Sequence, residues 1–198
     1  MDPKEISLQP GDALVIVDVQ NDFLPGGSLA VADGDQILPV VNALAERFAE
    51  AGLPVVATRD WHSADHRSFA AEGGPWPPHC VTGTPGAEFS AELRLPPGTP
   101  VVSKGVEAGD ESYSNFERTD LDPLLRAAGA RRIFLVGLAT DYCVGQTAVE
   151  ALSRGYEVVL VPQGMRAVVP AQGQAMLERL QREGAEIVNV SSTGSPAG

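Results

Sequence analysis

Four side chains that can attack, bind a cation or transfer a proton stand at the ends of strand-like segments. In chain order they are Asp18, Asp60, Lys104 and Cys143. Because the carboxyl ends of parallel strands meet at one edge of a sheet, where open α/β sheets bind ligands, we expect these side chains to lie close together. Each alone could be a helix cap or a solvated charge, but their joint placement favours an active site.

Cys143 is the candidate nucleophile of this set. It opens an expected helix, where unpaired backbone N–H groups and the helix dipole favour a thiolate. Asp18 could be the general base, since a carboxylate at an apolar strand end can have a raised pKa. Lys104 could hold that carboxylate in place and stabilise developing negative charge. The structural alternatives are a buried packing cysteine and a simple Asp18–Lys104 salt bridge.

The histidines suggest a metal site. Asp60 and His62 are two residues apart, so in an extended segment their side chains share one face. Adding His79 gives a set of two histidines and one carboxylate, which suits iron(II), manganese(II) or zinc(II) with coordination positions left open. His66 could be a further ligand or support one. The alternative is a loop whose histidines form local hydrogen bonds, and the Cys80 thiol beside His79 adds little.

The segments that must position these residues alternate between strand and helix patterns. Strands are expected at 13–18, 54–58, 100–104, 132–136, 157–161 and 186–190, and helices at 35–52, 121–128, 143–154 and 171–183. The first strand-like run is almost entirely apolar, which is typical of a strand covered on both faces. The pattern predicts an α/β fold with three α/β/α layers, a six-stranded, mainly parallel sheet and right-handed crossovers.

Two long segments, 60–99 and 105–119, interrupt this alternation. Structureless segments of that length inside a compact domain are usually functional. The whole chain, 1–198, is expected to form a single domain, and residues 191–198, which are rich in serine and glycine, are expected to be a frayed tail.

The composition of the chain restricts the kinds of partner that the protein can bind. At 198 residues and 43% hydrophobic content, the chain can bury a substantial core. Its formal charge of -12 repels nucleic acid and anionic membrane surfaces. No apolar run approaches the ~20 residues of a membrane span, and the first residues lack a signal-peptide pattern. We therefore expect a cytoplasmic protein with both cysteines reduced and no nucleic-acid or membrane partner.

Short motifs between about Asp12 and Val190 carry a resemblance to a known family. They are Val17-Asp18-Val-Gln-Asn-Asp-Phe23, Gly26-Gly27-Ser-Leu-Ala, Thr58-Arg-Asp60-Trp-His62 with Asp65-His66, Trp76-Pro-Pro-His79-Cys80-Val-Thr-Gly-Thr-Pro-Gly86, Ser103-Lys104-Gly105, Tyr113-Ser-Asn-Phe116 and Gly137-Leu-Ala-Thr-Asp-Tyr-Cys143-Val. Together they resemble the nicotinamidase (pyrazinamidase) group of the isochorismatase-like cysteine hydrolase superfamily. The Asp, Lys and Cys motifs mark the superfamily broadly, and the Asp/His set with its Trp-Pro-Pro-His-Cys stretch marks nicotinamidases more specifically.

The resemblance implies a role for each site residue. The catalytic triad would be Asp18, Lys104 and Cys143. One divalent ion (zinc, iron or manganese) that contacts a pyridine nitrogen would be held by Asp60, His62 and His79. A non-proline cis peptide would precede Ala139, whose N–H would join that of Cys143 in an oxyanion hole. The pocket-lining positions would be Phe23, Leu29, Trp76 and Tyr113, for which plain core packing is the alternative.

The implied reaction is the hydrolysis of nicotinamide to nicotinic acid and ammonia, a step of NAD salvage, through a thioester on Cys143. Pyrazinamide is expected to react in the same way. Within the superfamily the alternatives are another amide or carbamoyl hydrolase and isochorismatase, whose enol-ether chemistry does not need a cysteine nucleophile. A metal- or ligand-binding protein that keeps the fold without catalysis is the alternative from another class. A homo-oligomer is compatible with the sequence.

Overall fold

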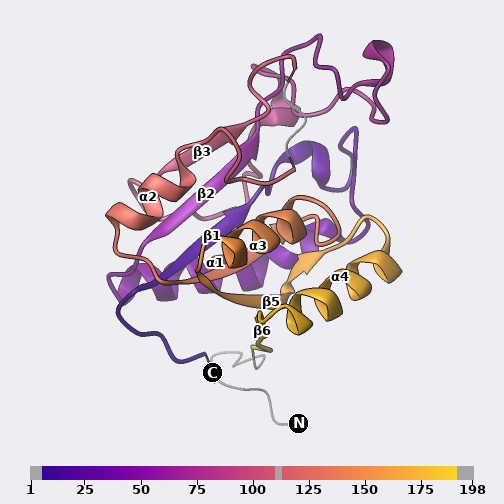
Figure 1. Ribbon diagram of the computed structural model, residues 1–198. Coiled ribbons are helices and arrows are strands. Elements are labelled where there is room, and N and C mark those ends of the chain that lie inside the picture. Colours follow the sequence, from indigo (N-terminus) through magenta and orange to yellow (C-terminus); the bar gives the residue numbers. More distant parts are fainter. Residues whose placement is uncertain (1–5, 110–112, 191–198) are drawn as a thin grey trace, which may run out of the picture.

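Six strands form a parallel sheet at the centre of the protein, seen in a computed structural model that describes residues 6–109 and 113–190 (Figure 1). The strands are β1 (Asp12–Val17), β2 (Val55–Asp60), β3 (Val101–Lys104), β4 (Arg132–Leu138), β5 (Glu157–Arg166) and β6 (Glu186–Ile187). Their order across the sheet is β3-β2-β1-β4-β5-β6, and all neighbouring pairs are parallel. This confirms the predicted fold class. The expected tail, 191–198, lies outside the described residues.

Helices cover both faces of the sheet. They are α1 (Leu38–Glu50), α2 (Leu121–Ala127), α3 (Cys143–Ser153) and α4 (Pro170–Arg182). The helix α1 lies on one face and α3 and α4 on the other (Figure 1). Alternate side chains of β1 divide between the two cores: Leu14 and Ile16 pack with α1, and Val15 and Val17 pack with α2 and α3. This two-sided burial explains why β1 is an unbroken apolar run.

Most boundaries shift by one or two residues from those expected, and three elements differ more. The predicted 35–52 helix is a 3-10 turn, Gly34–Ile37, followed by α1, because Pro39 in the first turn suits a helix start. The strand β5 continues to Arg166 past Pro162, where its register against β4 shifts, a place where a strand tolerates proline. The expected 186–190 strand pairs over only two residues at the sheet edge.

The topology creates a natural binding site at the carboxyl ends of the central strands. From β1 the chain builds β2 and β3 on one side, and then crosses over to place β4 on the other side of β1. Ligands of open α/β sheets bind at such a reversal. The two long segments lie beyond this edge of the sheet (Figure 1). Beyond β2, their described residues contain short 3-10 turns at Ala70–Glu72 and Pro85–Ala87 and isolated β-bridges such as His62–Val81 and Phe69–Trp76.

Among the described residues, no helix combines the length and the apolar character that crossing a bilayer requires.

Candidate active site

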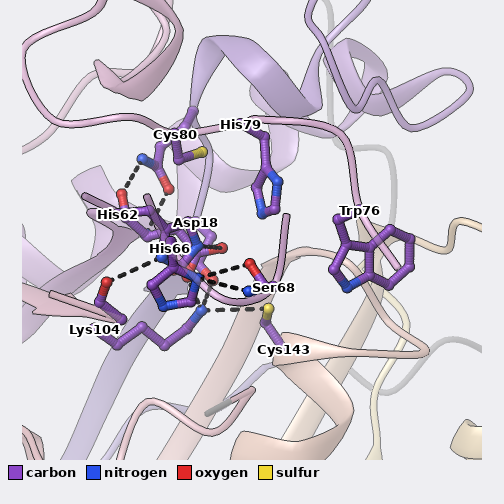
Figure 2. A network of polar contacts seen from close by, with 12 residues as sticks. Asp18, His62, His66, Ser68, Trp76, His79, Cys80, Lys104 and Cys143 are labelled. Atoms are coloured by element: carbon purple, nitrogen blue, oxygen red, sulfur yellow. Dashed lines mark hydrogen bonds and ion pairs between the residues drawn. The ribbon is translucent and has the colours of Figure 1, made fainter. Parts of the chain in front are cut away.

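The four predicted strand-end residues meet in one buried cluster, of which Figure 2 labels Asp18, Lys104 and Cys143. Asp18 directly follows β1, with a φ of 50° that turns the chain out of the strand. Asp60 and Lys104 are the last residues of β2 and β3, and Cys143 is the first residue of α3. A left-handed backbone is uncommon outside glycine, and such outliers gather at functional sites. The parallel sheet therefore assembles the cluster that the sequence predicted.

Lys104 lies at the centre of this cluster and is 2% exposed. Its Nζ is 3.2 Å from Asp18 Oδ2 and 3.5 Å from Cys143 Sγ, and it also donates to Asp60 Oδ1. The ammonium thus donates hydrogen bonds to Asp60 and Cys143 and forms an ion pair with Asp18. One cation links both carboxylates to the thiol.

Burial and charge set the ionisation of the two groups that face the thiol. Burial raises the pKa of the Asp18 carboxyl above its usual range, although Lys104 opposes the shift. Thr58 Oγ1 donates to Asp18 Oδ1 at 2.7 Å, which fixes the carboxylate. Burial alone would lower the pKa of Lys104, but Asp18 and Asp60 outweigh it and hold that pKa well above its ordinary value. The lysine therefore stays cationic, and Asp18 is the more readily protonated carboxylate.

Burial has the largest effect on the ionisation of Cys143. Burial, together with the negative charge of Asp18 and Asp60, raises the pKa of the Cys143 thiol well above its ordinary value, against the opposing effect of Lys104. Desolvation at this buried position therefore outweighs the effect of the helix terminus, which favours a thiolate. A base must take the proton when the sulfur reacts.

The loop before Cys143 is fixed by its backbone contacts. The Leu138–Ala139 peptide bond is cis, as the resemblance implied. The Asp141 carboxylate accepts from the N–H groups of Val168 and Val169 at 2.9 and 2.8 Å, and Thr140 N–H donates to the Arg166 carbonyl at 2.8 Å. These bonds fasten the loop to the segment between β5 and α4. The loop carries Ala139 to the wall of the cavity that Cys143 also lines.

A second group of side chains, which could coordinate a metal ion, lies beside this cluster. One donor atom from each of Asp60, His62 and His79 lies within 4.8 Å of the others, and all three residues are buried. The His62 Nδ1 is 3.0 Å from the Gly105 carbonyl and the His79 Nδ1 is 2.8 Å from the Pro77 carbonyl. These carbonyls make Nδ1 the protonated nitrogen, so each Nε2 lone pair is left for a cation, as in protein metal sites. The residues fit a divalent metal.

The packing around the histidines explains two further sequence features. At Gly105, which has a φ of 63°, a Cβ would come within 2.4 Å of the His62 ring, so only glycine allows the ring to sit there. The His66 ring lies 4.1 Å from that of His62, and its Nδ1 is 2.7 Å from Ser68 Oγ. His66 is not one of the three residues that converge as ligands. Its ring packs against that of His62 instead.

Two supporting residues were not singled out from the sequence. The buried Gln20 amide donates to the Asp60 and Ala87 carbonyls at 2.7 and 2.8 Å and accepts from the Asp60 N–H at 2.8 Å. The Asp22 carboxylate accepts from the Cys80 N–H at 2.7 Å, and a Cβ at Gly86 would strike that carboxylate. Both lie in the motif that follows Asp18, and polar residues beside a buried strand end were the available signal.

Lys104 and Cys143 of the first group and all three residues of the second line one cavity of about 260 Å³, while Asp18 is buried behind Lys104. All four residues predicted to line a pocket do line it, as do the nucleophile and the three converging ligands. Trp76 Nε1 donates to the Tyr113 hydroxyl at 3.0 Å, and Tyr142 packs edge-on against Trp76 at 5.2 Å between ring centroids. Phe23 lies 5.7 Å from the His79 ring. The cavity is largely apolar, with several aromatic rings in its walls, and the thiol and the metal set both line it.

Residues 12–192 of the sequence match the isochorismatase domain. The chain belongs to the isochorismatase family. This family member is 40% identical over 186 residues to the nicotinamidase/pyrazinamidase of Mycobacterium tuberculosis, covering 89% of this chain and 97% of that protein.

Two solved structures of the family resemble this member closely. One is the pyrazinamidase of Pyrococcus horikoshii in complex with zinc, at a TM-score of 0.88 and 46% identity, covering 91% of this chain and 99% of that one. The other is PnC1 from L. infantum in complex with nicotinate, at a TM-score of 0.86 and 38% identity, covering 94% and 96%.

Proposed function

We propose that this isochorismatase-family protein is a nicotinamidase, which hydrolyses nicotinamide to nicotinic acid and ammonia and accepts pyrazinamide as well. The observation that carries the proposal is one cavity lined by Cys143, by the Lys104 that links its thiol to the buried Asp18, and by a two-histidine, one-carboxylate set. A pyridine carboxamide has one group for each: an amide carbonyl for the sulfur and a ring nitrogen for the metal. The names of the relatives support the same substrate class.

In the first half of the reaction Cys143 attacks the amide carbon. Asp18, whose raised pKa makes it a competent acceptor, takes the thiol proton as the carbon–sulfur bond forms. The backbone N–H groups of Ala139 and Cys143 stabilise the oxyanion, an effect often worth ~10²–10³ in rate for each donor. Asp18 then returns the proton to the leaving nitrogen, and ammonia departs. A nicotinoyl thioester remains on the sulfur.

In the second half water releases the acid. Asp18 removes a proton from water, the resulting hydroxide attacks the thioester carbonyl, and the carbon–sulfur bond breaks. The sulfur recovers its proton from Asp18, which restores the starting state. Lys104 remains cationic throughout and offsets the negative charge that moves between Asp18 and Cys143. These roles explain why both carboxylates and the thiol share one ammonium.

The aromatic and metal-binding residues position the ring. Phe23, Leu29, Trp76 and Tyr113 supply apolar walls for the ring. Asp60, His62 and His79 would hold one divalent ion (zinc, iron or manganese), which supplies a Lewis acid with open positions for a pyridine nitrogen. Nicotinamide is neutral, so it approaches a protein of charge -12 without repulsion. We further propose that the protein acts in the cytoplasm in NAD salvage as one domain.

Ammonia release from four amides tests the proposal. Nicotinamide and pyrazinamide both carry a ring nitrogen meta to the carboxamide-bearing carbon, whereas benzamide has none and picolinamide has it in the ortho position. We expect high kcat/KM for the first two and much lower values for the others. His79→Ala should lower the metal content and shrink the preference for nicotinamide over benzamide. Equal rates on nicotinamide and benzamide in the metal-loaded enzyme would refute the role of the ring nitrogen.

A further inference from the structure

Two groups of side chains among the described residues have metal-binding geometry, and they share Asp60. The first is the Asp60, His62 and His79 set, and the second consists of Asp18, Asp60 and Cys143. In each group the donor atoms lie within 4.8 Å of one another. Carboxylates and a cysteine thiolate are ligands that zinc and related ions accept. The second group contains the nucleophile, so a metal bound there would coordinate the reacting sulfur.

The second group already holds a cation, which is the ammonium of Lys104. Its Nζ contacts one atom of each member: Asp18 Oδ2, Asp60 Oδ1 and Cys143 Sγ. Asp18 Oδ2 is buried and has no hydrogen bond of good geometry within the described residues, so this oxygen depends on the cation 3.2 Å away. Asp60 divides its carboxylate, because Oδ1 faces Lys104 and Oδ2 faces His62 Nε2 at 3.7 Å.

We propose that Lys104 is the resident cation of the Asp18, Asp60 and Cys143 group and thereby keeps divalent metal away from the nucleophile. This role rests on the proposed function, because it assumes that the neighbouring set binds a metal. The enzyme must bind one divalent ion next to a thiol that prefers the same ions. A covalently fixed cation solves this conflict, since it fills the central position and neutralises the carboxylates without coordinating the sulfur.

Removing the cation has a definite chemical consequence. Without it, the buried Asp18 carboxylate has no countercharge and lies close to Asp60 Oδ1, which has lost its cationic partner, an arrangement that attracts a further cation. A divalent ion would then bind Asp18, Asp60 and the sulfur of Cys143. The S–H bond breaks, its proton passes to solvent, and a metal–sulfur bond forms with no change of oxidation state. Loss of Lys104 should therefore create a second metal site, in addition to its effects on catalysis.

The test compares Lys104→Met, which removes the charge at similar length, with Lys104→Arg, which keeps a cation. Each protein and the wild type are equilibrated with Cd²⁺, and the ions bound per chain are counted after dialysis. Cadmium–thiolate coordination is followed through its ultraviolet charge-transfer band, which histidine and carboxylate ligands do not produce. We expect one ion and no band for the wild type and Lys104→Arg, and two ions with the band for Lys104→Met. The double variant Lys104→Met/Cys143→Ser should lose the band.

The outcomes separate this inference from the proposed function. A wild type that binds no Cd²⁺ would contradict the proposed metal set itself. A wild type that binds one ion, alongside a folded Lys104→Met that also binds only one, would overturn the role of Lys104 alone. A thiolate band in the wild type would overturn it too. If Lys104→Met does not fold by circular dichroism, Lys104→Gln takes its place, and the wild-type measurement still decides whether the sulfur is shielded.

Discussion

At the scale of single residues, the two cysteines differ in their surroundings: those of Cys143 suit catalysis, and those of Cys80 suit packing in the core. Cys80 is 0% exposed and its pKa is strongly raised by burial, whereas Cys143 is 7% exposed and lines the cavity. Both are free thiols. Only the second has a base and a cation beside its sulfur.

We predict that Cys143→Ala abolishes ammonia release without unfolding the protein. Iodoacetamide should modify Cys143 faster than Cys80, and nicotinamide should slow that reaction because it fills the same cavity. Peptide mass spectrometry of the labelled protein measures both rates, and Cys80→Ala is the control that keeps the labelling. Substantial turnover by Cys143→Ala would exclude the sulfur as nucleophile.

A second residue-scale prediction concerns the base. Asp18→Asn keeps the shape and the Thr58 contact but cannot accept a proton, so kcat should fall by ~10²-fold or more. Steady-state ammonia release on nicotinamide measures the loss. Asp35→Asn, an exposed carboxylate of the Gly34–Ile37 turn, is the matched control and should keep normal kcat. Near-normal kcat for Asp18→Asn would mean that another group is the base.

At the scale of elements, Gln20 joins three parts of the chain and positions a metal ligand. Its amide bonds both backbone groups of Asp60 at the end of β2 and the Ala87 carbonyl in the long loop. We predict that Gln20→Ala weakens metal binding by roughly 10–100-fold, the usual effect of losing a group that orients a ligand. Gln20→Glu can still accept from the Asp60 N–H but cannot donate to either carbonyl, so it should not restore the affinity. Metal titration measures the affinity of both variants. An unchanged metal affinity in Gln20→Ala would show that Gln20 does not position Asp60 for the metal.

A contact between α2 and the residue before β5 predicts how the stability of the fold depends on pH. The Tyr156 hydroxyl donates to Asp122 Oδ1 at 2.7 Å, and burial together with that carboxylate raises the pKa of Tyr156 to about 12. A raised pKa stabilises the fold fully below the unfolded value of about 10, and this stability is lost as the pH rises from there through 12. Relative to Tyr156→Phe, the wild type should lose up to about 2 kcal/mol between pH 9 and pH 12. Urea unfolding of both proteins at pH 9 and pH 12 measures this loss of unfolding free energy. An equal loss in the wild type and in Tyr156→Phe would contradict the raised pKa of Tyr156.

The elements were largely predictable from the sequence because each strand and helix has its own local pattern. The apolar run of β1 indicates burial on both faces, and the residues at the strand ends indicate the functional edge. The contacts of Gln20, Asp22 and Asp141 were not predictable, because they join segments far apart in the chain through backbone groups that leave no pattern. The same holds for the Cys143 pKa, which depends on tertiary burial that a helix-terminus argument does not include.

At the scale of the whole molecule, the charge and the fold act on substrate and product differently. The substrate amide is neutral, and the product acid is an anion that forms inside a protein of formal charge -12. The overall field therefore opposes retention of the product, while Lys104 in the cavity is already neutralised by two carboxylates. The fold also connects the site to global stability, because its proposed metal ligands come from the end of β2 and from two points of the long loop that follows.

The last prediction measures that connection through metal removal. An ion bound by Asp60, His62 and His79 closes the loop between β2 and His79 in the folded state only, so it stabilises that state by mass action. Free ion at about 100 times its Kd adds ~2.7 kcal/mol, which for a chain of this length raises Tm by about 5–10 °C. Chelation should lower Tm by that amount, and returning the metal should restore it.

The histidine variants decide which side chains carry this shift. His79→Ala removes a ligand, so its Tm should be the same with and without metal. His66→Ala removes only the ring stacked on His62, so it should keep most of the metal-dependent increase. Differential scanning calorimetry of the three proteins, each with metal and with chelator, measures the six values. A wild-type Tm that chelation leaves unchanged would contradict the metal site, and loss of the shift in His66→Ala would make His66 a fourth ligand.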